Sequence, residues 1–305
     1  MALFDSELLY DGSVTRPGPP DSQAFYKAFE TEAPGGPLEG SAVIAGDSAT
    51  ALRSLPEGTF QTCVTSPPYW SLRDYHIPGQ IGLEPTIDEY LNNLVKVFAE
   101  VRRTLREDGT LWLNVGDSYT SGNRTWRAPD RKNRGRAMEV RPSTPDGLKP
   151  KDLIGVPWRL AFALQADGWF LRTDIIWNKP NCQPESVKDR PTRCHEYIFL
   201  FTKSERYFYD NEARRGPNGR NLRTVWDVMT RPYEEAHFAT FPPDLVEPCI
   251  TLSSRPTDFV LDPFLGSGTT AVVAAAMRRR FVGIELNPEY ARLAMKRLSN
   301  IIVQR

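Results

Sequence analysis

Short apolar segments alternate with stretches of helical periodicity along most of the chain, and this alternation constrains the fold more than any other feature. Residues 87–109, for example, carry apolar side chains at helical spacing up to Gly109, and the apolar run TLWLNV follows them. Strands that alternate with helices build a mainly parallel sheet with helices on both faces. A chain of 305 residues is long enough for one large domain or two small ones. The sequence therefore predicts an α/β protein.

Charge and cysteine usage exclude several classes of protein. The formal net charge is zero, so any signal for a nucleic-acid or membrane partner must be local. The four cysteines are scattered without a CxxC pair and the three histidines lie far apart, which favours reduced thiols and predicts no metal site. The acidic N-terminus does not resemble a signal peptide, and no apolar run approaches the roughly 20 residues that span a bilayer. We therefore expect a soluble, intracellular protein.

The pattern of apolar and irregular stretches divides the chain into six segments. They are an N-terminal arm rich in Pro, Gly and acids (1–40), a first α/β block (41–118), a basic irregular loop (119–151), a second block (152–203), a second irregular segment (204–235) and a last block (236–305). Between Ser121 and Lys151 the chain has nine Lys or Arg residues against three acids. This loop is either a solvated surface or a site of phosphate contact.

The stretch TSPPYW, Thr65 to Trp70, ends an apolar run that is typical of a short buried strand. Proline cannot donate to a sheet ladder, and it forces the preceding residue into an extended conformation. For an arbitrary pair of prolines the simplest interpretation is a stiff surface turn. The rest of the chain must decide whether this turn has a further role.

A glycine turn lies near the C-terminus, in the stretch LDPFLGSGTT between a predicted strand and a predicted helix. Glycines at such a turn let backbone N–H groups approach a ligand at the positive end of a helix. Glu285 follows Gly268 by seventeen residues, at the end of the next strand, where a carboxylate can accept hydrogen bonds from ribose hydroxyls. The pattern Gly266-x-Gly268-x-x-Ala271 also satisfies the dinucleotide fingerprint. A nucleoside-type cofactor is predicted, and the alternative is a plain turn with a surface Glu.

The position of this turn links it to TSPPYW. Only about twenty residues follow Glu285, so the last block cannot complete a sheet unless the N-terminal strands join it. Both loops would then lie at the carboxyl ends of neighbouring parallel strands, where open α/β sheets bind their ligands.

TSPPYW together with DPFLGSGTT and GIELNPEY resembles the amino-DNA methyltransferases that use S-adenosylmethionine, and the order of the two loops is similar to that of their β group. The resemblance covers roughly residues 41–118, 152–203 and 236–298. It implies a Rossmann-like methyltransferase fold with a mainly parallel seven-stranded sheet, a circularly permuted motif order and small irregular target-recognition insertions. Residues 41–118 would be the catalytic half of the domain and residues 236–305 the S-adenosylmethionine-binding half.

The chemistry of an exocyclic amine explains the double proline. The nitrogen lone pair is delocalised into the ring, so acceptors for its two N–H bonds favour the change toward a tetrahedral nucleophile. Ser66 Oγ and the Pro67 carbonyl are the predicted acceptors, because Pro67 and Pro68 hold the backbone rigid without a competing N–H. Tyr69 is predicted to stack on a base swung out of the duplex. Trp70 is either a wall of the pocket or part of the core.

The resemblance also implies the residues that bind the cofactor. Asp262, Phe264, Gly266, Gly268 and Phe241 would face the methionine moiety, Glu285 would hold the ribose, and Asp47 would contact the adenine edge. The alternatives are a helix N-cap for Asp47, and an ordinary turn and core position for Asp262 and Phe241.

These observations predict a site-specific DNA methyltransferase that flips a cytosine of double-stranded DNA and methylates its N4 amine. Ser before Pro-Pro is typical of cytosine-N4 enzymes, but the family also has adenine-N6 enzymes with Ser there, so adenine-N6 transfer remains open. Further alternatives are an NAD(P)-dependent oxidoreductase that uses the glycine turn and a catalytically silent DNA-binding protein.

The segments 119–151 and 204–235 would select the target. A separately acting restriction endonuclease and a cytoplasmic, nucleoid-associated location are expected. The recognition sequence and the oligomeric state do not follow from the sequence.

Overall fold

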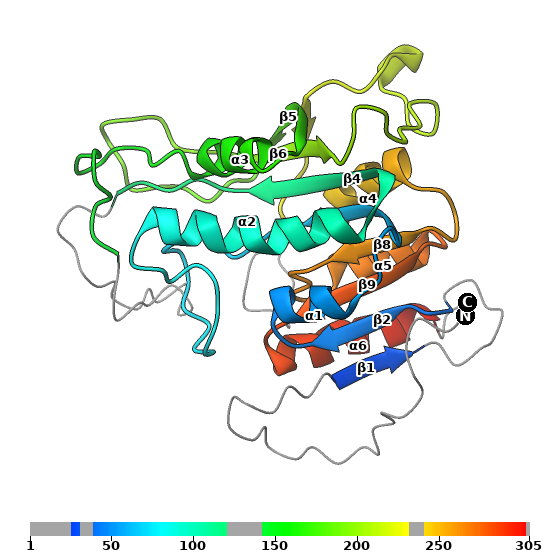
Figure 1. Ribbon diagram of the computed structural model, residues 1–305. Coiled ribbons are helices and arrows are strands. Elements are labelled where there is room, and N and C mark those ends of the chain that lie inside the picture. The colour runs from blue at the N-terminus through cyan, green and yellow to red at the C-terminus, as the bar shows by residue number, and fades with distance from the viewer. Residues whose placement is uncertain (1–25, 31–38, 121–141, 232–240, 303–305) are drawn as a thin grey trace.

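A single mixed sheet organises the protein, which is represented by a computed structural model that describes residues 26–30, 39–120, 142–231 and 241–302 (Figure 1). Its nine strands lie in the order β1-β2-β9-β8-β3-β4-β6-β5-β7. The strands are β1 (Tyr26–Glu30), β2 (Ala42–Ala45), β3 (Phe60–Thr65), β4 (Leu105–Val115), β5 (Phe170–Asn178), β6 (His195–Thr202), β7 (Val225–Asp227), β8 (Phe259–Asp262) and β9 (Arg280–Glu285). From β2 to β4 all neighbours are parallel, and β6 runs antiparallel to both β4 and β5.

The seven central strands form the predicted sheet, and two short strands extend it at its edges. β1 comes from the predicted N-terminal arm and pairs antiparallel with β2. β7 comes from the irregular segment 204–235 and pairs parallel with β5. The predicted α/β class and Rossmann-like topology are confirmed, and the two edge strands come from the N-terminal arm and from the segment 204–235.

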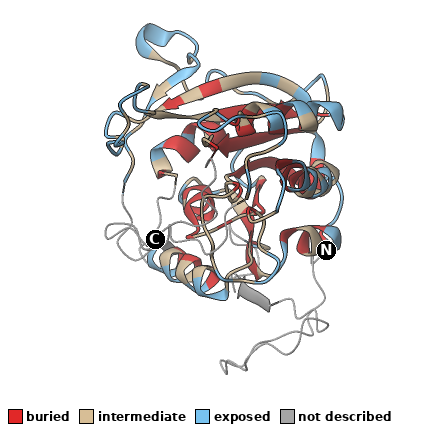
Figure 2. Ribbon diagram, turned by 90° about the vertical axis from the view of Figure 1, so that its left-hand side faces the viewer, coloured by how far each residue is buried: buried red, intermediate tan, exposed pale blue. Residues whose placement is uncertain are grey.

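Helices cover both faces of the sheet, as Figure 1 shows. They are α1 (Ser48–Ser54), α2 (Ile87–Thr104), α3 (Val156–Ala166), α4 (Pro243–Ser253), α5 (Thr269–Ala276) and α6 (Pro288–Ile302). Buried side chains of α1, α2 and α3 belong to one hydrophobic cluster, and those of α4, α5 and α6 belong to a second cluster on the opposite face. The buried strands lie between these layers (Figure 2). Among the described helices, none combines the length and the hydropathy that a membrane crossing requires.

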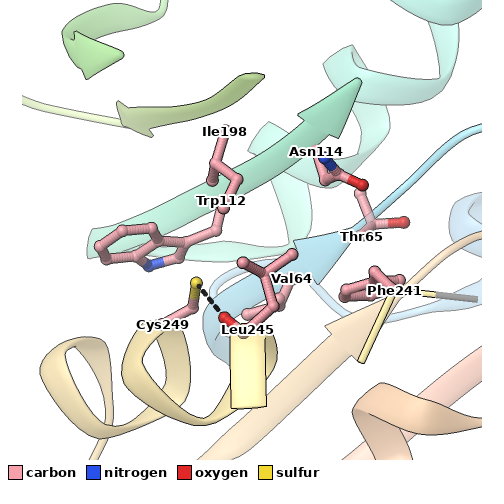
Figure 3. A pocket seen from close by; sticks show the side chains of 8 residues that line it. All are labelled: Val64, Thr65, Trp112, Asn114, Ile198, Phe241, Leu245 and Cys249. Carbon is pink, nitrogen blue, oxygen red and sulfur yellow. Dashed lines mark hydrogen bonds between the residues drawn. The ribbon is translucent and has the colours of Figure 1, made fainter. Parts of the chain in front are cut away.

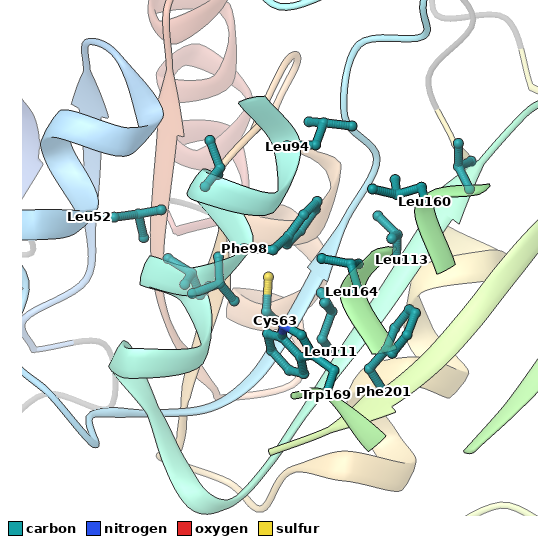
Figure 4. Packing of buried hydrophobic residues seen from close by; sticks show 14 of the residues in the cluster. Leu52, Cys63, Leu94, Phe98, Leu111, Leu113, Leu160, Leu164, Trp169 and Phe201 are labelled. Carbon is teal, nitrogen blue, oxygen red and sulfur yellow. The ribbon is translucent and has the colours of Figure 1, made fainter. Parts of the chain in front are cut away.

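Helix α2 shows how the sequence pattern creates this packing. Thr86 caps its N-terminus by accepting a hydrogen bond from the Glu89 N–H, and the apolar residues predicted from the periodicity point to the sheet. Leu94 and Phe98 are fully buried (Figure 4). Burying a side chain of this size stabilises the fold by about 1.5–3 kcal/mol relative to exposure.

The prediction that this helix continues to Gly109 is wrong. The helix ends at Thr104, and residues 105–109 begin β4 instead. Leu105 is fully buried, but its backbone is extended and its Cα pairs with that of Phe60 on β3. Sheet pairing therefore replaces the last turn of the predicted helix, because the apolar period alone does not distinguish the two.

The order of the strands brings the two ends of the chain together. β3 and β8 are adjacent and parallel, with Cys63 paired with Leu261, although they lie almost two hundred positions apart. The loops that follow β2, β3, β8 and β9 consequently emerge at one edge of the sheet, which we call the carboxyl edge. This edge is where a parallel sheet binds ligands.

Candidate active site

The Ser-Pro-Pro-Tyr loop and the glycine turn meet at the carboxyl edge. Thr65 is the last residue of β3 and Asp262 is the last residue of β8. The Thr65 hydroxyl donates a hydrogen bond to Asp262 Oδ1 at 2.6 Å, and both residues are buried. The structure thus places the two predicted loops side by side rather than on opposite sides of the molecule.

The two prolines differ in what their carbonyls contact. The Pro68 carbonyl accepts a hydrogen bond from the Tyr90 hydroxyl at 2.9 Å. Within the described part of the chain, no hydrogen bond ends on the Pro67 carbonyl, so this oxygen keeps its lone pairs for a ligand. Trp70 is only 2% exposed, and its Nε1–H donates to the Glu84 carbonyl at 3.0 Å. Of the two alternatives for Trp70, the structure therefore supports a place in the core.

Tyr69 is held at both the hydroxyl and the ring. Its hydroxyl lies 2.7 Å from Glu196 Oε2 and 3.4 Å from Ser66 Oγ. The ring packs against Gly116, where an added Cβ would lie 2.6 Å from a ring carbon. Burial, reinforced by the neighbouring Glu196 carboxylate, raises the pKa of Tyr69 well above its ordinary value. Tyr69 is therefore a neutral phenol with a fixed orientation.

Three polar residues of this site were not predicted from the sequence. Asn114 on β4 donates through Nδ2 to Glu196 Oε2 at 3.2 Å and to the Tyr197 carbonyl at 3.1 Å. Lys179, which follows β5, forms an ion pair with Glu196 on β6. Each lies at or beside the end of an apolar strand on the carboxyl side of the sheet. A polar residue at such a position is the available signal, but Asn114 lies in the segment 41–118 and the other two in 152–203, and none of them belongs to a recognisable motif.

Asp262 is the most buried ionisable group of the cofactor side. Its Oδ1 accepts hydrogen bonds from Thr65 and from the Phe264 N–H at 3.1 Å, whereas its Oδ2 is buried without a partner among the described residues. Burial raises the pKa of this carboxyl to about 6, although the hydrogen bonds oppose the shift. A buried acceptor without a partner is unfavourable, and a bound donor would relieve that cost.

The glycine turn has the conformation that its sequence predicts. Gly266 and Gly268 have φ of +55° and +87°. An added Cβ at Gly268 would lie 2.8 Å from the Ala294 Cβ on α6, so this glycine permits close helix packing. An added Cβ at Gly266 would meet no described atom closer than 4.0 Å, so the space above it is open.

Glu285 joins the end of β9 to this turn. Its Oε2 accepts a hydrogen bond from the Gly266 N–H at 2.7 Å, and its Oε1 accepts one from the Asn287 N–H at 2.7 Å. Burial is the main cause that raises the pKa of Glu285 to about 7. Each carboxylate oxygen retains a second lone pair that a hydroxyl group can use.

The remaining cofactor predictions fall at the same edge but differ in environment. Asp47 caps α1, with Oδ1 accepting from the Thr50 N–H at 2.8 Å, so its capping alternative is present. Phe264 packs edge-on against Phe98 with ring centroids 6.3 Å apart. Phe241 lines a small cavity with Thr65, as Figure 3 shows. The segment before Phe241 lies outside the described residues.

The two irregular segments reach different parts of the molecule. Residues 121–141 of the basic loop lie outside the described residues, but its Thr120 N–H donates to the Asp152 carbonyl near the carboxyl edge. The beginning of the segment 204–235 packs at the opposite edge, where the Phe208 N–H donates to the Asp108 carbonyl at the start of β4. After β7 the chain returns to the carboxyl edge, where Asn181 and Thr230 exchange hydrogen bonds.

Comparison with known proteins decides what this arrangement is. A family model described as DNA methylase, which groups the N6 and N4 enzymes, matches residues 60–296. The chain is a member of this DNA methylase family. The Type II methyltransferase M.XycI of Xanthomonas campestris pv. cyanopsidis is 62% identical over 273 residues, which is 87% of this chain and 91% of that protein. M.SmaI of Serratia marcescens, also a Type II methyltransferase, is 60% identical over 86% of this chain and 91% of its own length. The methylase thus acts in DNA methylation of the restriction-modification type.

Solved structures agree with the fold of the methylase. TTHA0409 of Thermus thermophilus, in complex with S-adenosyl-L-methionine, superimposes with a TM-score of 0.60 at 29% identity and covers 85% of this chain and 94% of its own. The cytosine-N4-specific PvuII DNA methyltransferase superimposes with a TM-score of 0.64 at 22% identity and covers 86% and 91% of the two chains, which shows a shared fold.

The cofactor of the methylase is S-adenosylmethionine, and the residues at the carboxyl edge fit it. The free, buried Oδ2 of Asp262 is an acceptor for an ammonium group such as that of methionine. The open space above Gly266 leaves room for a ligand at the turn, and Glu285 retains acceptor capacity. An oxidoreductase that uses a nicotinamide at this turn is set aside by the family membership.

Proposed function

We propose that the methylase transfers a methyl group to the exocyclic N4 amine of a flipped cytosine in double-stranded DNA. The observation that carries the proposal is Ser66, a neutral hydroxyl acceptor at the end of β3, beside a Pro67 carbonyl that is free of hydrogen bonds within the described chain. A serine in this loop is typical of the cytosine-N4 enzymes that the chain resembles. The likeness to the PvuII enzyme concerns the fold alone, so the choice of the cytosine amine rests on the residues of the loop.

The residues of the chain act on the amine by accepting its hydrogen bonds. S-adenosylmethionine supplies a methyl group on a sulfonium sulfur. Ser66 Oγ and the Pro67 carbonyl each accept one N–H of the target amine, and they bind it more strongly as positive charge develops. Tyr69, fixed by Glu196 and Gly116, provides a ring for the extruded base to stack on. Serine is not basic enough to remove a proton first, so the methylated nitrogen loses its proton after transfer, to water.

The cofactor residues have separate roles in this proposal. Asp262 binds the amino group of the methionine moiety, with Phe264, Gly266, Gly268 and Phe241 around it. Glu285 holds the ribose and Asp47 contacts the adenine edge. The Thr65–Asp262 hydrogen bond supports this arrangement, because it fixes the cofactor side relative to the target loop.

Target selection belongs to segments that reach the carboxyl edge. We assign it to residues 119–151 and to the part of 204–235 that follows β7, because the earlier part packs at the opposite edge. A separate endonuclease that cleaves the same sequence is the proposed partner.

Mass spectrometry of nucleosides from DNA treated with the methylase tests the proposal. N4-methylcytosine is the expected product, and N6-methyladenine without N4-methylcytosine would overturn the choice of amine.

Ser66→Ala is expected to lower the rate of methyl transfer by about 10-fold or more, since one lost transition-state hydrogen bond of about 1.4 kcal/mol corresponds to that factor. Full activity of this variant would contradict the acceptor role of Ser66.

A further inference from the structure

A partly buried ion pair, Lys179 with Glu196, lies directly behind the Ser66 loop. The side chains of Lys179 and Glu196 are each 17% exposed, and Lys179 also lies over the Trp177 ring, 4.1 Å from its centroid. Buried ion pairs add little stability compared with apolar residues of the same volume. The contacts of this pair with Tyr69 and Asn114 therefore suggest a role in the pocket.

The Glu196 carboxylate determines the direction of the hydrogen bonds around it. An ionised carboxylate only accepts. Tyr69 has one hydroxyl proton and three possible acceptors: Glu196 Oε2 at 2.7 Å, Asn114 Oδ1 at 3.3 Å and Ser66 Oγ at 3.4 Å. The proton goes to Glu196, because the shorter bond to a charged group is the stronger one. Asn114 donates through Nδ2 to Glu196 and to the Tyr197 carbonyl, which leaves its Oδ1 as an acceptor.

The direction of the Tyr69 hydrogen bond determines the direction of the Ser66 hydrogen bond. Because the Tyr69 proton is committed to Glu196, the phenolic oxygen presents lone pairs to Ser66 Oγ, 3.4 Å away. The Ser66 hydroxyl then donates toward Tyr69 and keeps its own lone pairs for the pocket. An amine with two N–H donors requires acceptors of this kind.

We propose that Glu196 is a positioning residue for methyl transfer, which acts through Tyr69 so that Ser66 faces the target amine as a hydrogen-bond acceptor. Lys179 supplies the counter-charge that makes a carboxylate at this place tolerable. The inference rests on the proposed acceptor role of Ser66 and assigns Glu196 no contact with the substrate.

The isosteric variant Glu196→Gln tests the inference. Lys179 attracts the amide oxygen of the new side chain, so its NH2 group turns to Tyr69. The charged acceptor that commits the phenolic proton is then lost, and the Ser66 hydroxyl is no longer held as a donor toward Tyr69. In the folded variant, the single-turnover rate constant for methyl transfer is expected to fall by about 10-fold or more, whereas the dissociation constant of S-adenosylmethionine keeps its value. Glu247→Gln is the matched control, because Glu247 pairs with Arg214 on the exposed side of α4, and it should transfer at the wild-type rate.

Tyr69→Phe separates a role through the phenol from a general structural role. In the Tyr69→Phe background, Glu196→Gln should cause less than about a 2-fold further loss, since the link to Ser66 is already absent. Wild-type transfer by Glu196→Gln, or multiplication of the two separate losses in the double variant, would overturn the inference.

A second variant covers the case in which Glu196→Gln unfolds. Replacing the pair by Lys179→Met and Glu196→Met keeps its volume and removes both charges. The expected result is a folded protein that binds S-adenosylmethionine and transfers slowly, and transfer at the wild-type rate would again refute the role of Glu196. All rates are measured on whichever amine the wild-type protein methylates. N6-methyladenine as the product would therefore contradict only the proposed cytosine-N4 function. The ratio of the variant rate to the wild-type rate tests the role of Glu196 separately.

Discussion

At the scale of single residues, two acidic side chains at the carboxyl edge stand out: Asp262, which is buried, and Glu285, which is partly buried. Burial raises the pKa of Asp262 to about 6 and that of Glu285 to about 7, and the Asp262 charge contributes to the second shift. Both groups are thus partly protonated just below neutral pH. Their proposed roles, however, require the carboxylate forms. A carboxylate only accepts hydrogen bonds, as an ammonium group or a hydroxyl donor requires, whereas a protonated carboxyl group also donates one.

Cofactor affinity should therefore depend on pH. The dissociation constant of S-adenosylmethionine, measured by calorimetry, is expected to fall as pH rises from about 5.5 to about 8, through the two raised pKa values. Asp262→Asn should weaken binding by about 10-fold at pH 8 and flatten the dependence below pH 7. A dissociation constant that is the same across this range would contradict the assigned roles.

Without cofactor, the same shifts have the opposite effect on stability. The folded protein holds protons on Asp262 and Glu285 at pH values where the unfolded chain has released them. Their contribution to the free energy of unfolding is present below about pH 4 and is lost as pH rises to about 7. Binding and stability should thus follow opposite trends with pH in this range.

Asp47 combines a helix cap with a proposed adenine contact, and two substitutions separate these roles. Asp47→Ala removes the cap and should lower the free energy of unfolding by about 1 kcal/mol, whereas Asp47→Ser keeps a capping oxygen. Both should weaken S-adenosylmethionine binding about 10-fold if the carboxylate contacts the adenine. Denaturant titration and calorimetry on the two variants check this, and unchanged affinity in both would leave Asp47 as a cap alone.

At this scale the sequence predicts residues that belong to recognisable loops and misses those that act from other strands. Ser66, Pro67, Asp262 and Glu285 lie at turns whose glycines and prolines are visible in the sequence. Glu196 comes close to Tyr69 only because β6 inserts antiparallel between β4 and β5. No local pattern contains that pairing.

At the scale of elements, α5 and α6 support the glycine turn through direct contacts. Gly268 is the N-cap of α5 and packs against Ala294 of α6. Arg297 of the same helix donates to the Ser267 carbonyl at 2.6 Å. The turn is therefore held in place by contacts with α6.

A comparison of Gly268→Ala with Gly266→Ala should separate packing from ligand space. Both variants place a Cβ at positive φ, which costs about 1 kcal/mol, but only Gly268→Ala also meets Ala294. We expect Gly268→Ala to lower the free energy of unfolding by about 2–3 kcal/mol. Gly266→Ala should lose about 1 kcal/mol and should bind S-adenosylmethionine more weakly. Equal stability of the two variants in denaturant titrations would contradict the tight contact.

Most elements are predictable because their periodicity and their boundaries agree. α2 shows where this fails, since its apolar spacing continues into Leu105 although the backbone has already turned extended. β1 and β7 lie in Pro-, Gly- or Arg-rich stretches without strand patterning, and they form because the neighbouring edge strands offer partners.

At the scale of the whole molecule, charge balance conceals an uneven distribution. The net charge is zero, yet residues 121–151 carry an excess of six positive charges, nine against three. DNA binding by a neutral protein must depend on such local groups, because there is no overall field to attract the phosphates.

The affinity of the methylase for DNA should therefore fall steeply with salt. Between about 50 and about 200 mM salt, neutralisation of six phosphates would reduce the association constant by about 10³-fold, and this can be measured by fluorescence anisotropy on a short duplex. Replacing Arg131, Lys132, Arg134 and Arg136 by Gln should make the salt slope shallower. A slope that these substitutions leave unchanged would place the phosphate contacts elsewhere.

The single hydrogen bond from Thr65 to Asp262 has a consequence for the order of events on DNA. S-adenosylmethionine that orders Asp262 also restricts Thr65, at the end of β3, beside the loop that receives the extruded nucleotide. By thermodynamic reciprocity, bound duplex must then raise the affinity for S-adenosylmethionine by the same factor as bound S-adenosylmethionine raises the affinity for the duplex. After turnover, the affinity of the enzyme for its methylated site would thus fall once the demethylated cofactor dissociates.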